Sequence, residues 1–421
     1  MAALIAFYIL TLSRIRHAIN RRKHPFAASS DSGGSYITVL RKLNGLGLSK
    51  VIIYGGKVRF ALEFPGWPSR AFNRMAGRGG FNLTHSGTGS NRHNHSAFLS
   101  ITSSCPLHCQ HCYERDMVGQ GEAVPITRWK EVVQEVQKLG VAVIVLTGGE
   151  PMSRFDGLIE ILSTGNKDLS EFHIHTSGQG VTVENARRLK GYGLSAAGLG
   201  FDHWDRSRFD ELRGLEGAYE QALEAARCFH QVGIFTYLNV CLTKELVDNN
   251  GLPKLLDVAK TMGAGMVRFL DPKPVGGYFG IDSETLFPRT YQDRVVDFAL
   301  RANKAKEFRN HPLIISIAFL ESPDRLGCGM GGNSIFYVDS RGNVTPCVFL
   351  PLTFGNILTE DVSTIFDRMC EEIPSRIRTE CPASVFADIL HQRVEEGCDL
   401  PVPHRAVKDE FQALFARDKR F

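Results

Sequence analysis

The stretch Ser104-Cys105-Pro106-Leu107-His108-Cys109-Gln110-His111-Cys112-Tyr113 places three cysteines close together in a C-x3-C-x2-C pattern. The apolar run 97–102 precedes it and is typical of a buried β-strand. Three thiolates can bind three irons of a cubane iron–sulfur cluster and leave the fourth iron open. An open coordination position distinguishes a catalytic metal site from a structural one. The stretch therefore predicts an open metal site at the end of a strand.

Strand-like and helix-like patterns alternate from residue 97 to about residue 317. Repeated strand–helix units form a parallel sheet, and six in a row predict an open or partial barrel. The predicted fold class is therefore α/β, with a partial (β/α)6 TIM-like barrel over residues 97–320. The expected strands are 97–102, 141–146, 171–175, 195–201, 234–242 and 265–270, and the expected helices are 127–139, 156–163, 182–191, 215–232, 250–262 and 289–305.

Two more loops follow predicted strands and would reach the same rim of the barrel as the cysteines. Val145-Leu146-Thr147-Gly148-Gly149-Glu150-Pro151 ends a strand in a glycine pair, and Thr176-Ser177-Gly178 follows the next strand. Taken alone, both are ordinary turn sequences. Active sites of such barrels lie at the carboxyl ends of the strands, so we expect the three loops to form one site.

A second cysteine pattern lies near the C-terminus, in CGMGGNSIFYVDSRGNVTPC, residues 328–347. Strand patterns at 335–338 and 343–345 flank a turn at 339–342, which predicts a hairpin with Cys328 and Cys347 at its open end. Two cysteines brought together in this way predict a second metal site in a small C-terminal domain, residues 321–421.

Composition narrows the remaining possibilities. The chain has 421 residues, enough for an enzyme domain and a smaller domain, and its net charge of +4 does not suggest a nucleic-acid partner. The trio at 105–112 is too tight for a regular disulfide framework, so metal binding in a reducing cytoplasm is the better interpretation. Cys228 and Cys241 interrupt apolar patterns and are expected to be core thiols.

Residues 1–25 predict an amphipathic helix that is basic toward its C-terminal end. The apolar run 2–12 is too short to span a membrane, so contact of residues 1–23 with a membrane surface and docking on the protein itself both remain open. The predicted location is cytoplasmic, with a peripheral position at the inner membrane face as the alternative. Residues 26–96 are expected to form a linker and a small extension containing a hairpin around Gly55-Gly56.

From the cysteine loop onward the chain resembles the radical S-adenosylmethionine (SAM) superfamily, which uses this cysteine spacing. Gly148-Gly149-Glu150 is similar to the superfamily's GGE motif, and Cys328-x13-Gly342-x4-Cys347 is similar to the signature of SPASM and twitch domains. The resemblance covers about residues 97–400. The chain lacks the later C-x2-C-x5-C-x3-C part of the SPASM pattern, which favours one auxiliary cluster over two.

The resemblance implies a role for each motif. Cys105, Cys109 and Cys112 would bind a [4Fe-4S] cluster whose open iron chelates SAM. Asp202, in Gly200-Phe201-Asp202-His203, would lie near the substrate as a catalytic residue. The remaining expected sites are Tyr113, Gly148, Gly149, Glu150, Ser177 and Asn239 for SAM, and Cys328, Cys347, Cys381 and Cys398 for a probable auxiliary iron–sulfur cluster.

Several of these residues also have an ordinary structural interpretation. Tyr113 could belong to the core, Ser177 to a turn, and Asp202 to a helix or turn cap. Glu150 could order its own loop instead of approaching SAM. Cys370 falls in the helical pattern 362–372 and is the expected spare thiol, although it competes with Cys381 for the auxiliary site.

The implied function is a radical SAM oxidoreductase. SAM would be cleaved reductively, and the resulting 5′-deoxyadenosyl radical would abstract a hydrogen from a peptide, lipid or small-molecule substrate. An electron donor such as flavodoxin or ferredoxin would be the partner. The alternative is a zinc-binding barrel, scaffold or hydrolase, in which His108 and His111 join the cysteines. A third possibility is a membrane-surface binding partner with degenerate chemistry.

Overall fold

A ten-stranded sheet runs through the computed structural model, which describes residues 50–78, 95–375 and 377–416. Seven neighbouring strands of this sheet are parallel and follow chain order. They are β3 (Ser96–Ser100), β4 (Val143–Thr147), β5 (Glu171–Thr176), β6 (Leu194–Gly200), β7 (Phe235–Cys241), β8 (Met266–Leu270) and β9 (Leu313–Ser316). The six predicted strands are confirmed, and β9 adds a seventh.

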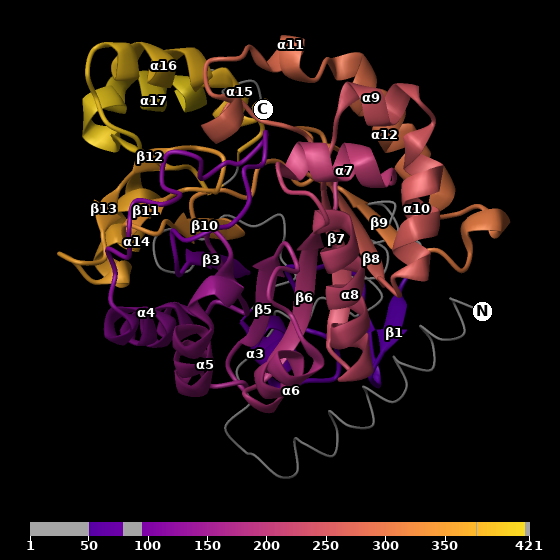
Figure 1. Cartoon of the computed structure of the whole chain (residues 1–421). Coiled ribbons are helices and arrows are strands. Elements are labelled where there is room, and N and C mark those ends of the chain that lie inside the picture. Colours follow the sequence, from indigo (N-terminus) through magenta and orange to yellow (C-terminus); the bar gives the residue numbers. More distant parts are fainter. Residues whose placement is uncertain (1–49, 79–94, 376, 417–421) are drawn as a thin grey trace.

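Helices cover the outer face of these strands (Figure 1). Alternate strand residues such as Leu99, Leu146 and Leu199 share one buried cluster with Trp129 and other helix residues, because successive strand side chains point to opposite faces. The α-helices of the barrel are α4 (Ile126–Leu139), α5 (Phe155–Thr164), α6 (Val183–Gly191), α7 (Arg206–Arg213), α8 (Ala218–Gln231), α9 (Lys244–Asp248), α10 (Gly251–Thr261), α11 (Ser283–Leu286), α12 (Arg289–Ala302) and α13 (Ile317–Leu320). The short 3-10 helices are η2 (Pro151–Arg154), η3 (Gly276–Tyr278) and η4 (Lys306–Phe308).

Helix α7 is the main difference from the sequence prediction, which placed no helix between residues 201 and 215. It begins after Asp205, whose side chain accepts a hydrogen bond from the backbone nitrogen of Arg208, and ends at Gly214 in a left-handed conformation. An aspartate before the first turn is an ordinary signal for the start of a helix, and a left-handed glycine is an ordinary signal for its end. The helix has a weak apolar pattern because only three of its residues are buried, so its periodicity did not reveal it.

An N-terminal segment closes one end of the barrel interior. Strands β1 (Ile52–Tyr54) and β2 (Lys57–Arg59) form the predicted hairpin, and α3 (Arg70–Gly77) follows. Arg59 pairs with Glu171, the first residue of β5, at 2.6 Å between Nη1 and Oε1. Leu62 packs among inward-facing residues of β6, β7, β8 and β9. The segment therefore closes the end of the barrel at which the strands begin.

The C-terminal residues extend the barrel sheet beyond β3. Strand β10 (Ile335–Val338) pairs in parallel with β3 and antiparallel with β11 (Asn343–Thr345), which confirms the predicted hairpin. Within the described part of the chain β13 and β9 are the two edges, so the barrel is open. The other elements are β12 (Leu352–Thr353), β13 (Gly355–Asn356), α14 (Val362–Glu372), α15 (Pro382–Val385), α16 (Ala387–Glu395), β14 (Val402–Pro403), η5 (His404–Val407) and α17 (Lys408–Ala416).

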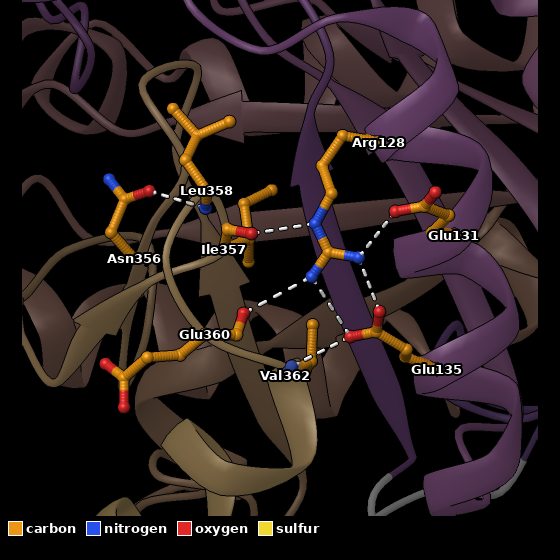
Figure 2. A network of polar contacts seen from close by, with 8 residues as sticks. All are labelled: Arg128, Glu131, Glu135, Asn356, Ile357, Leu358, Glu360 and Val362. Carbon is orange, nitrogen blue, oxygen red and sulfur yellow. Dashed lines mark hydrogen bonds and ion pairs between the residues drawn. The ribbon is translucent and has the colours of Figure 1, made fainter.

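A polar network joins helix α4 of the barrel to the C-terminal region (Figure 2). The Arg128 guanidinium donates to the backbone oxygens of Ile357 at 2.7 Å and Glu360 at 3.3 Å. Oε2 of Glu135, which also belongs to α4, accepts from the backbone nitrogen of Val362 at 2.8 Å. This carboxylate lies at the N-terminus of α14, where the helix dipole favours a negative charge.

The predicted N-terminal helix (1–25), residues 26–49 of the linker and extension, and the loop at 79–94 lie outside the described residues. No helix in the ranges that the structure describes is long and apolar enough to cross a membrane.

Candidate active site

One cavity of about 990 Å³ lies at the carboxyl ends of the barrel strands. Residues of the cysteine loop, the glycine-pair loop and the C-terminal hairpin all line it. Its lining includes most of the expected site residues: Cys105, Cys109, Cys112, Tyr113, Gly148, Gly149, Ser177, Asp202, Asn239, Cys328, Cys347 and Cys381. The structure therefore brings together segments that are more than 250 residues apart in the sequence.

Backbone hydrogen bonds hold the cysteine loop against two other loops. The nitrogens of His108 and Gln110 donate to the oxygens of Arg213 and Leu212, both at 3.0 Å, at the end of α7. On the other side, the nitrogen of Gly277 donates to the oxygen of Cys112 at 2.8 Å. The loop is thus fixed by tertiary contacts from residue 108 to residue 112.

The glycine pair allows the second loop to approach the cysteine loop closely. The nitrogen of Gly149 donates to the oxygen of Thr102 at 2.8 Å, and the nitrogen of Glu150 donates to the oxygen of Ser104 at 2.7 Å. A Cβ at Gly149 would lie 2.4 Å from the Ser104 oxygen, and one at Gly148 would lie 2.5 Å from the Thr102 oxygen. Neither position can accept a side chain without moving the loops apart.

Glu150 orders the loop after β5. Its Oε1 accepts from the nitrogen of Met152 at 3.1 Å and from the hydroxyl of Thr176 at 2.7 Å. Its Oε2 accepts from the nitrogen of Ser177 at 2.7 Å and from the Ser177 hydroxyl at 2.5 Å. Burial raises the pKa of Glu150, and these hydrogen bonds oppose the rise. The contacts match the loop-ordering interpretation of Glu150.

Asp202 connects the end of β6 to the cysteine loop. Its Oδ2 lies 2.6 Å from Nη2 of Arg213 and 3.2 Å from Nε2 of His111, while Oδ1 accepts from the nitrogen of Cys241 at 2.8 Å. Burial favours the neutral acid, but Arg213 and then His111 outweigh it and lower the pKa of Asp202 to about 2. Asp202 is therefore an ionised buried carboxylate, and it is Asp205 that caps the nearby helix.

The three thiols of the cysteine loop lie in a partly buried site with one permanent cation. Burial raises the pKa of Cys105 to about 11 and, together with the charge of Cys109, that of Cys112 to about 12. Nη1 of Arg213 lies 3.8 Å from Sγ of Cys109. In the described ranges no three His, Cys, Asp or Glu side chains form a ligand group, and metal binding would require these thiols to lose their protons.

The donor set fits an iron–sulfur cluster better than a zinc knuckle. His111 is already paired with Asp202, and His108 is exposed and is not among the residues that line the cavity. Three thiolates without a fourth protein ligand leave an open position.

Tyr113 and Asn239 both line the cavity. The Tyr113 hydroxyl lies 3.2 Å from Oγ1 of Thr147, and its ring meets those of Tyr337 and Phe349 edge-on. Oδ1 of Asn239 is buried and has no hydrogen-bond partner among the described residues. A buried unpaired acceptor in a cavity is suited to a ligand that donates a hydrogen bond, as a nucleoside can.

The second thiol group contains Cys328, Cys347 and Cys381. Burial, followed by the charges of Glu321, Cys381 and Cys347, raises the pKa of Cys328 well above its ordinary value. Burial and the charge of Cys381 likewise raise the pKa of Cys347 to about 12. All three thiols line the cavity, and the nitrogen of Cys328 donates to the oxygen of Ile377 at 3.1 Å.

Cys370 and Cys398 are not among the residues that line this cavity. Cys370 is buried in α14, and the nitrogen of Cys398 donates to the oxygen of Arg393 at the end of α16. The cavity lining thus groups Cys381 with Cys328 and Cys347, and it does not include Cys398.

Three features of the site escaped the sequence prediction. Gly276 and Gly277 lie against the cysteine loop, where a Cβ would come within 2.1 Å of the Cys112 oxygen and 2.0 Å of the Gln110 oxygen, respectively. Cys241 lines the cavity instead of the core, whereas Cys228 is buried as expected. His175 also lines the cavity. The only available signal was that each follows or ends a predicted strand.

Comparison with known protein families matches the region of each thiol group to a different family. Residues 99–249 match the radical SAM superfamily, and residues 328–383 match SPASM, an iron–sulfur cluster-binding domain. The SPASM match includes Cys381 and ends before Cys398.

Similar proteins include enzymes of two kinds. The AdoMet-dependent heme synthase of Methanosarcina barkeri is 25% identical over 288 residues, which cover 63% of this chain and 80% of that protein. The PqqA peptide cyclase of Granulibacter bethesdensis is 30% identical over 257 residues, covering 59% of this chain and 66% of the cyclase.

Solved structures with the same fold include SuiB of Streptococcus suis bound to its precursor peptide SuiA. Its TM-score is 0.52 at 18% identity, with 64% of each chain covered. The enzyme anSMEcpe with bound AdoMet gives a TM-score of 0.53 at 20% identity, covering 66% of this chain and 82% of that chain.

Proposed function

The chain is a radical SAM enzyme with a C-terminal SPASM domain, and we propose that it oxidises a peptide substrate by C–H abstraction. Its radical SAM domain binds a [4Fe-4S] cluster and SAM, and its SPASM domain binds an auxiliary iron–sulfur cluster. The observation that carries the proposal is the single cavity lined by both thiol groups. A substrate in this cavity would lie between a site that removes a hydrogen atom and a site that can accept an electron.

The first thiol group would hold the SAM-binding cluster. We assign its three iron ligands to Cys105, Cys109 and Cys112. When bound, the reduced cluster and SAM supply a 5′-deoxyadenosyl radical that abstracts a hydrogen atom from a C–H bond. The protein's task is to hold the loops that surround SAM. Glu150 does so by fixing Ser177, and Asp202 does so by fixing the cysteine loop through His111.

The second thiol group would hold the auxiliary cluster. Cys328, Cys347 and Cys381 supply three ligands. Cys398, predicted as a further ligand, is not among the residues that line the cavity. An auxiliary cluster at this position would receive the electron that the substrate loses after hydrogen-atom removal. A flavodoxin or ferredoxin would supply electrons to the first cluster.

A peptide is the favoured substrate class. Several relatives are named PqqA peptide cyclases, and the fold is shared with SuiB, whose structure contains a precursor peptide. The cavity, at about 990 Å³, lies at the upper end of the range for small-molecule sites, which suits a peptide segment. Relatives named heme synthases favour a tetrapyrrole as the second candidate.

Iron content and SAM cleavage test the chemistry. After anaerobic reconstitution we expect about eight irons per chain, as two [4Fe-4S] clusters require. Adding SAM and dithionite should release 5′-deoxyadenosine. Protein that binds zinc in place of iron, or that releases no 5′-deoxyadenosine, would contradict the proposal.

Co-expression tests the substrate class. Short peptides encoded beside the gene are produced together with the enzyme and analysed by mass spectrometry. A peptide that loses the mass of two hydrogen atoms supports oxidation of a peptide. Consumption of an added porphyrin, with no change in any peptide, favours the second candidate.

Contact of residues 1–23 with a membrane remains part of the proposal. The sequence carries Arg14, Arg16, Arg21, Arg22 and Lys23 beside an apolar run, which suits an anionic membrane surface in the cytoplasm. Sedimentation with anionic liposomes should capture the full chain and not a chain that begins at residue 24. Equal sedimentation of both would contradict this contact.

A further inference from the structure

The barrel interior contains a continuous chain of polar side chains beneath the cavity. It consists of His175, Tyr237, His173 and Glu171, which we call the interior relay. Nε2 of His175 lies 2.9 Å from the Tyr237 hydroxyl, and that hydroxyl lies 3.5 Å from Nδ1 of His173. Nε2 of His173 lies 2.9 Å from Oε1 of Glu171. The relay leads from the cavity, which His175 lines, toward the N-terminal segment.

Strand geometry explains how these groups meet. Glu171, His173 and His175 alternate along β5, so all three point to the interior. Tyr237 belongs to β7 and must reach across β6 to contact them. It does so over Gly198, where a Cβ would lie 2.5 Å from the tyrosine ring. A side chain at Gly198 would therefore separate Tyr237 from the histidines.

The charges at the far end fix the direction of the hydrogen bonds. Arg59 lies 2.6 Å from Oε1 of Glu171, and burial is outweighed by Arg59 and then His173, so the pKa of Glu171 lies well below its usual range. An ionised carboxylate only accepts hydrogen bonds. Nε2 of His173 must therefore carry its proton, and Nδ1 of His173 must accept.

The same logic extends to the cavity. Because Nδ1 of His173 accepts, the Tyr237 hydroxyl donates to it and accepts from Nε2–H of His175. Nδ1 of His175 then carries a lone pair, and it has no hydrogen-bond partner among the described residues. One consistent orientation of the relay thus presents a basic nitrogen at the cavity.

We propose that His175 is the base that accepts the proton lost by the substrate during oxidation, and that Tyr237 passes the resulting charge to His173, where the Glu171 carboxylate stabilises it. This role rests on the proposed function. The oxidation removes three particles: a hydrogen atom goes to the 5′-deoxyadenosyl group, an electron to the auxiliary cluster, and a proton to Nδ1 of His175. The Nε2 proton of His175 moves to Tyr237, and the Tyr237 proton moves to His173. The relay ends with a His173 imidazolium beside the Glu171 carboxylate.

The surroundings keep His175 in its neutral form, which is the form that has a lone pair for a proton. Burial, followed by the charges of Arg268 and His173, lowers the pKa of His175 well below its ordinary value. Arg268 on β8 is in turn paired with Glu63 at 2.8 Å, and the ring of Phe98 on β3 meets the His175 ring edge-on. His175 is therefore neutral across the physiological range.

Chemical labelling of the reconstituted full chain tests the base. Diethyl pyrocarbonate acylates a neutral imidazole nitrogen that has a reachable lone pair, and mass spectrometry locates the product. N-acetylhistidine, added as an internal standard, should react about tenfold more slowly at about pH 5.5 than at about pH 7.5. We expect His175 to react at nearly equal rates at both pH values. Protection of His175 at both, or slowing parallel to the standard, would overturn the proposal.

A matched pair of variants tests the relay. Tyr237→Phe removes the hydroxyl that holds Nε2–H, so the lone pair is no longer fixed at Nδ1 and labelling of His175 should slow severalfold. Tyr219→Phe makes the same change on α8, away from the relay, and should leave labelling unchanged. An unchanged labelling rate in a folded Tyr237→Phe protein would overturn the relay. If that variant does not fold, the labelling of wild-type His175 at the two pH values still tests the base.

SAM cleavage, measured on the same wild-type samples, separates the two proposals. Normal release of 5′-deoxyadenosine with a protected His175 would overturn the role of His175 as the base and leave the proposed function intact. Absence of 5′-deoxyadenosine would overturn the proposed function and the role of the base with it.

Discussion

At the scale of single residues, Glu171 offers a direct comparison between a buried and an exposed cation. Arg59 lies 2.6 Å from its carboxylate with 3% of its side chain exposed, whereas Lys57 lies at 3.6 Å with 34% exposed. Arg59→Met leaves a buried charge without its main partner, so we expect it to lower the free energy of unfolding by about 3–5 kcal/mol. Lys57→Met should cost less than about 1 kcal/mol. Urea denaturation measures both, and equal losses would contradict the assignment.

The same carboxylate predicts a pH dependence. Its pKa in the folded chain lies below the unfolded value, so it stabilises the fold above the unfolded pKa, and the contribution is lost as the pH falls through the folded pKa. Arg59→Met removes the main cause of the lowered pKa. The stability difference between wild type and Arg59→Met should therefore be largest near neutral pH and narrow on acidification. Urea denaturation at several pH values tests this, and a constant difference would argue against it.

Glu150 gives a second prediction at this scale. In Glu150→Gln one carboxylate oxygen becomes an amide that cannot accept from Ser177 or Thr176, so the loop after β5 loses at least one hydrogen bond. We expect a loss of about 1–3 kcal/mol in stability and at least about tenfold weaker SAM binding by calorimetry. Glu160→Gln alters an exposed carboxylate on α5 and is the control. Unchanged SAM affinity in Glu150→Gln would show that this loop does not support the site.

At the scale of elements, two loops depend on each other through the glycine pair. Gly149→Ala places a methyl group 2.4 Å from the Ser104 oxygen, so the cysteine loop must move. We expect about half of the iron to be lost, from the first cluster alone, because that cluster accounts for about half of the total. Gly191→Ala, which meets no heavy atom within 4 Å, is the matched control. Full iron content in Gly149→Ala would show that the close approach is dispensable.

The thiols of the C-terminal element make a similar comparison. Cys381→Ala should lower the iron content of the auxiliary site because this thiol lies with Cys328 and Cys347. Cys370→Ala should leave iron near normal, since Cys370 is buried in α14. Iron analysis of Cys398→Ala decides whether the chain after α16 also reaches the cluster. Normal iron in Cys381→Ala would overturn the grouping.

At the scale of the whole molecule, the auxiliary region is held to the barrel by the β10–β3 pairing and by the network of Figure 2. Arg128→Ala removes the hydrogen bonds to Ile357 and Glu360 and leaves Glu135 without its cation. We expect a stability loss of about 1–3 kcal/mol and faster amide exchange in α14. Arg187→Ala, in an exposed pair on α6, is the control. Unchanged exchange in α14 would assign the docking to strand pairing alone.

The repeated strand–helix order and the local cysteine spacing could be predicted without a structure. Both depend on residues that are near one another in the chain. Apolar periodicity located the six strands, and turn residues between 338 and 343 located the C-terminal hairpin. The C-x3-C-x2-C loop and the glycine pair could likewise be recognised in the sequence because each motif is short and contiguous.

The meeting of distant groups could not be predicted in this way and became visible in the folded chain. Cys381 joins Cys328 and Cys347 while Cys398 does not line their cavity, and Glu150 binds the loop after the next strand. The interior relay was also invisible, because its members look like ordinary strand residues until a parallel register places Tyr237 opposite Gly198. The physical reason is that strand pairing and loop packing select partners by three-dimensional register, and that register depends on contacts between segments far apart in the sequence.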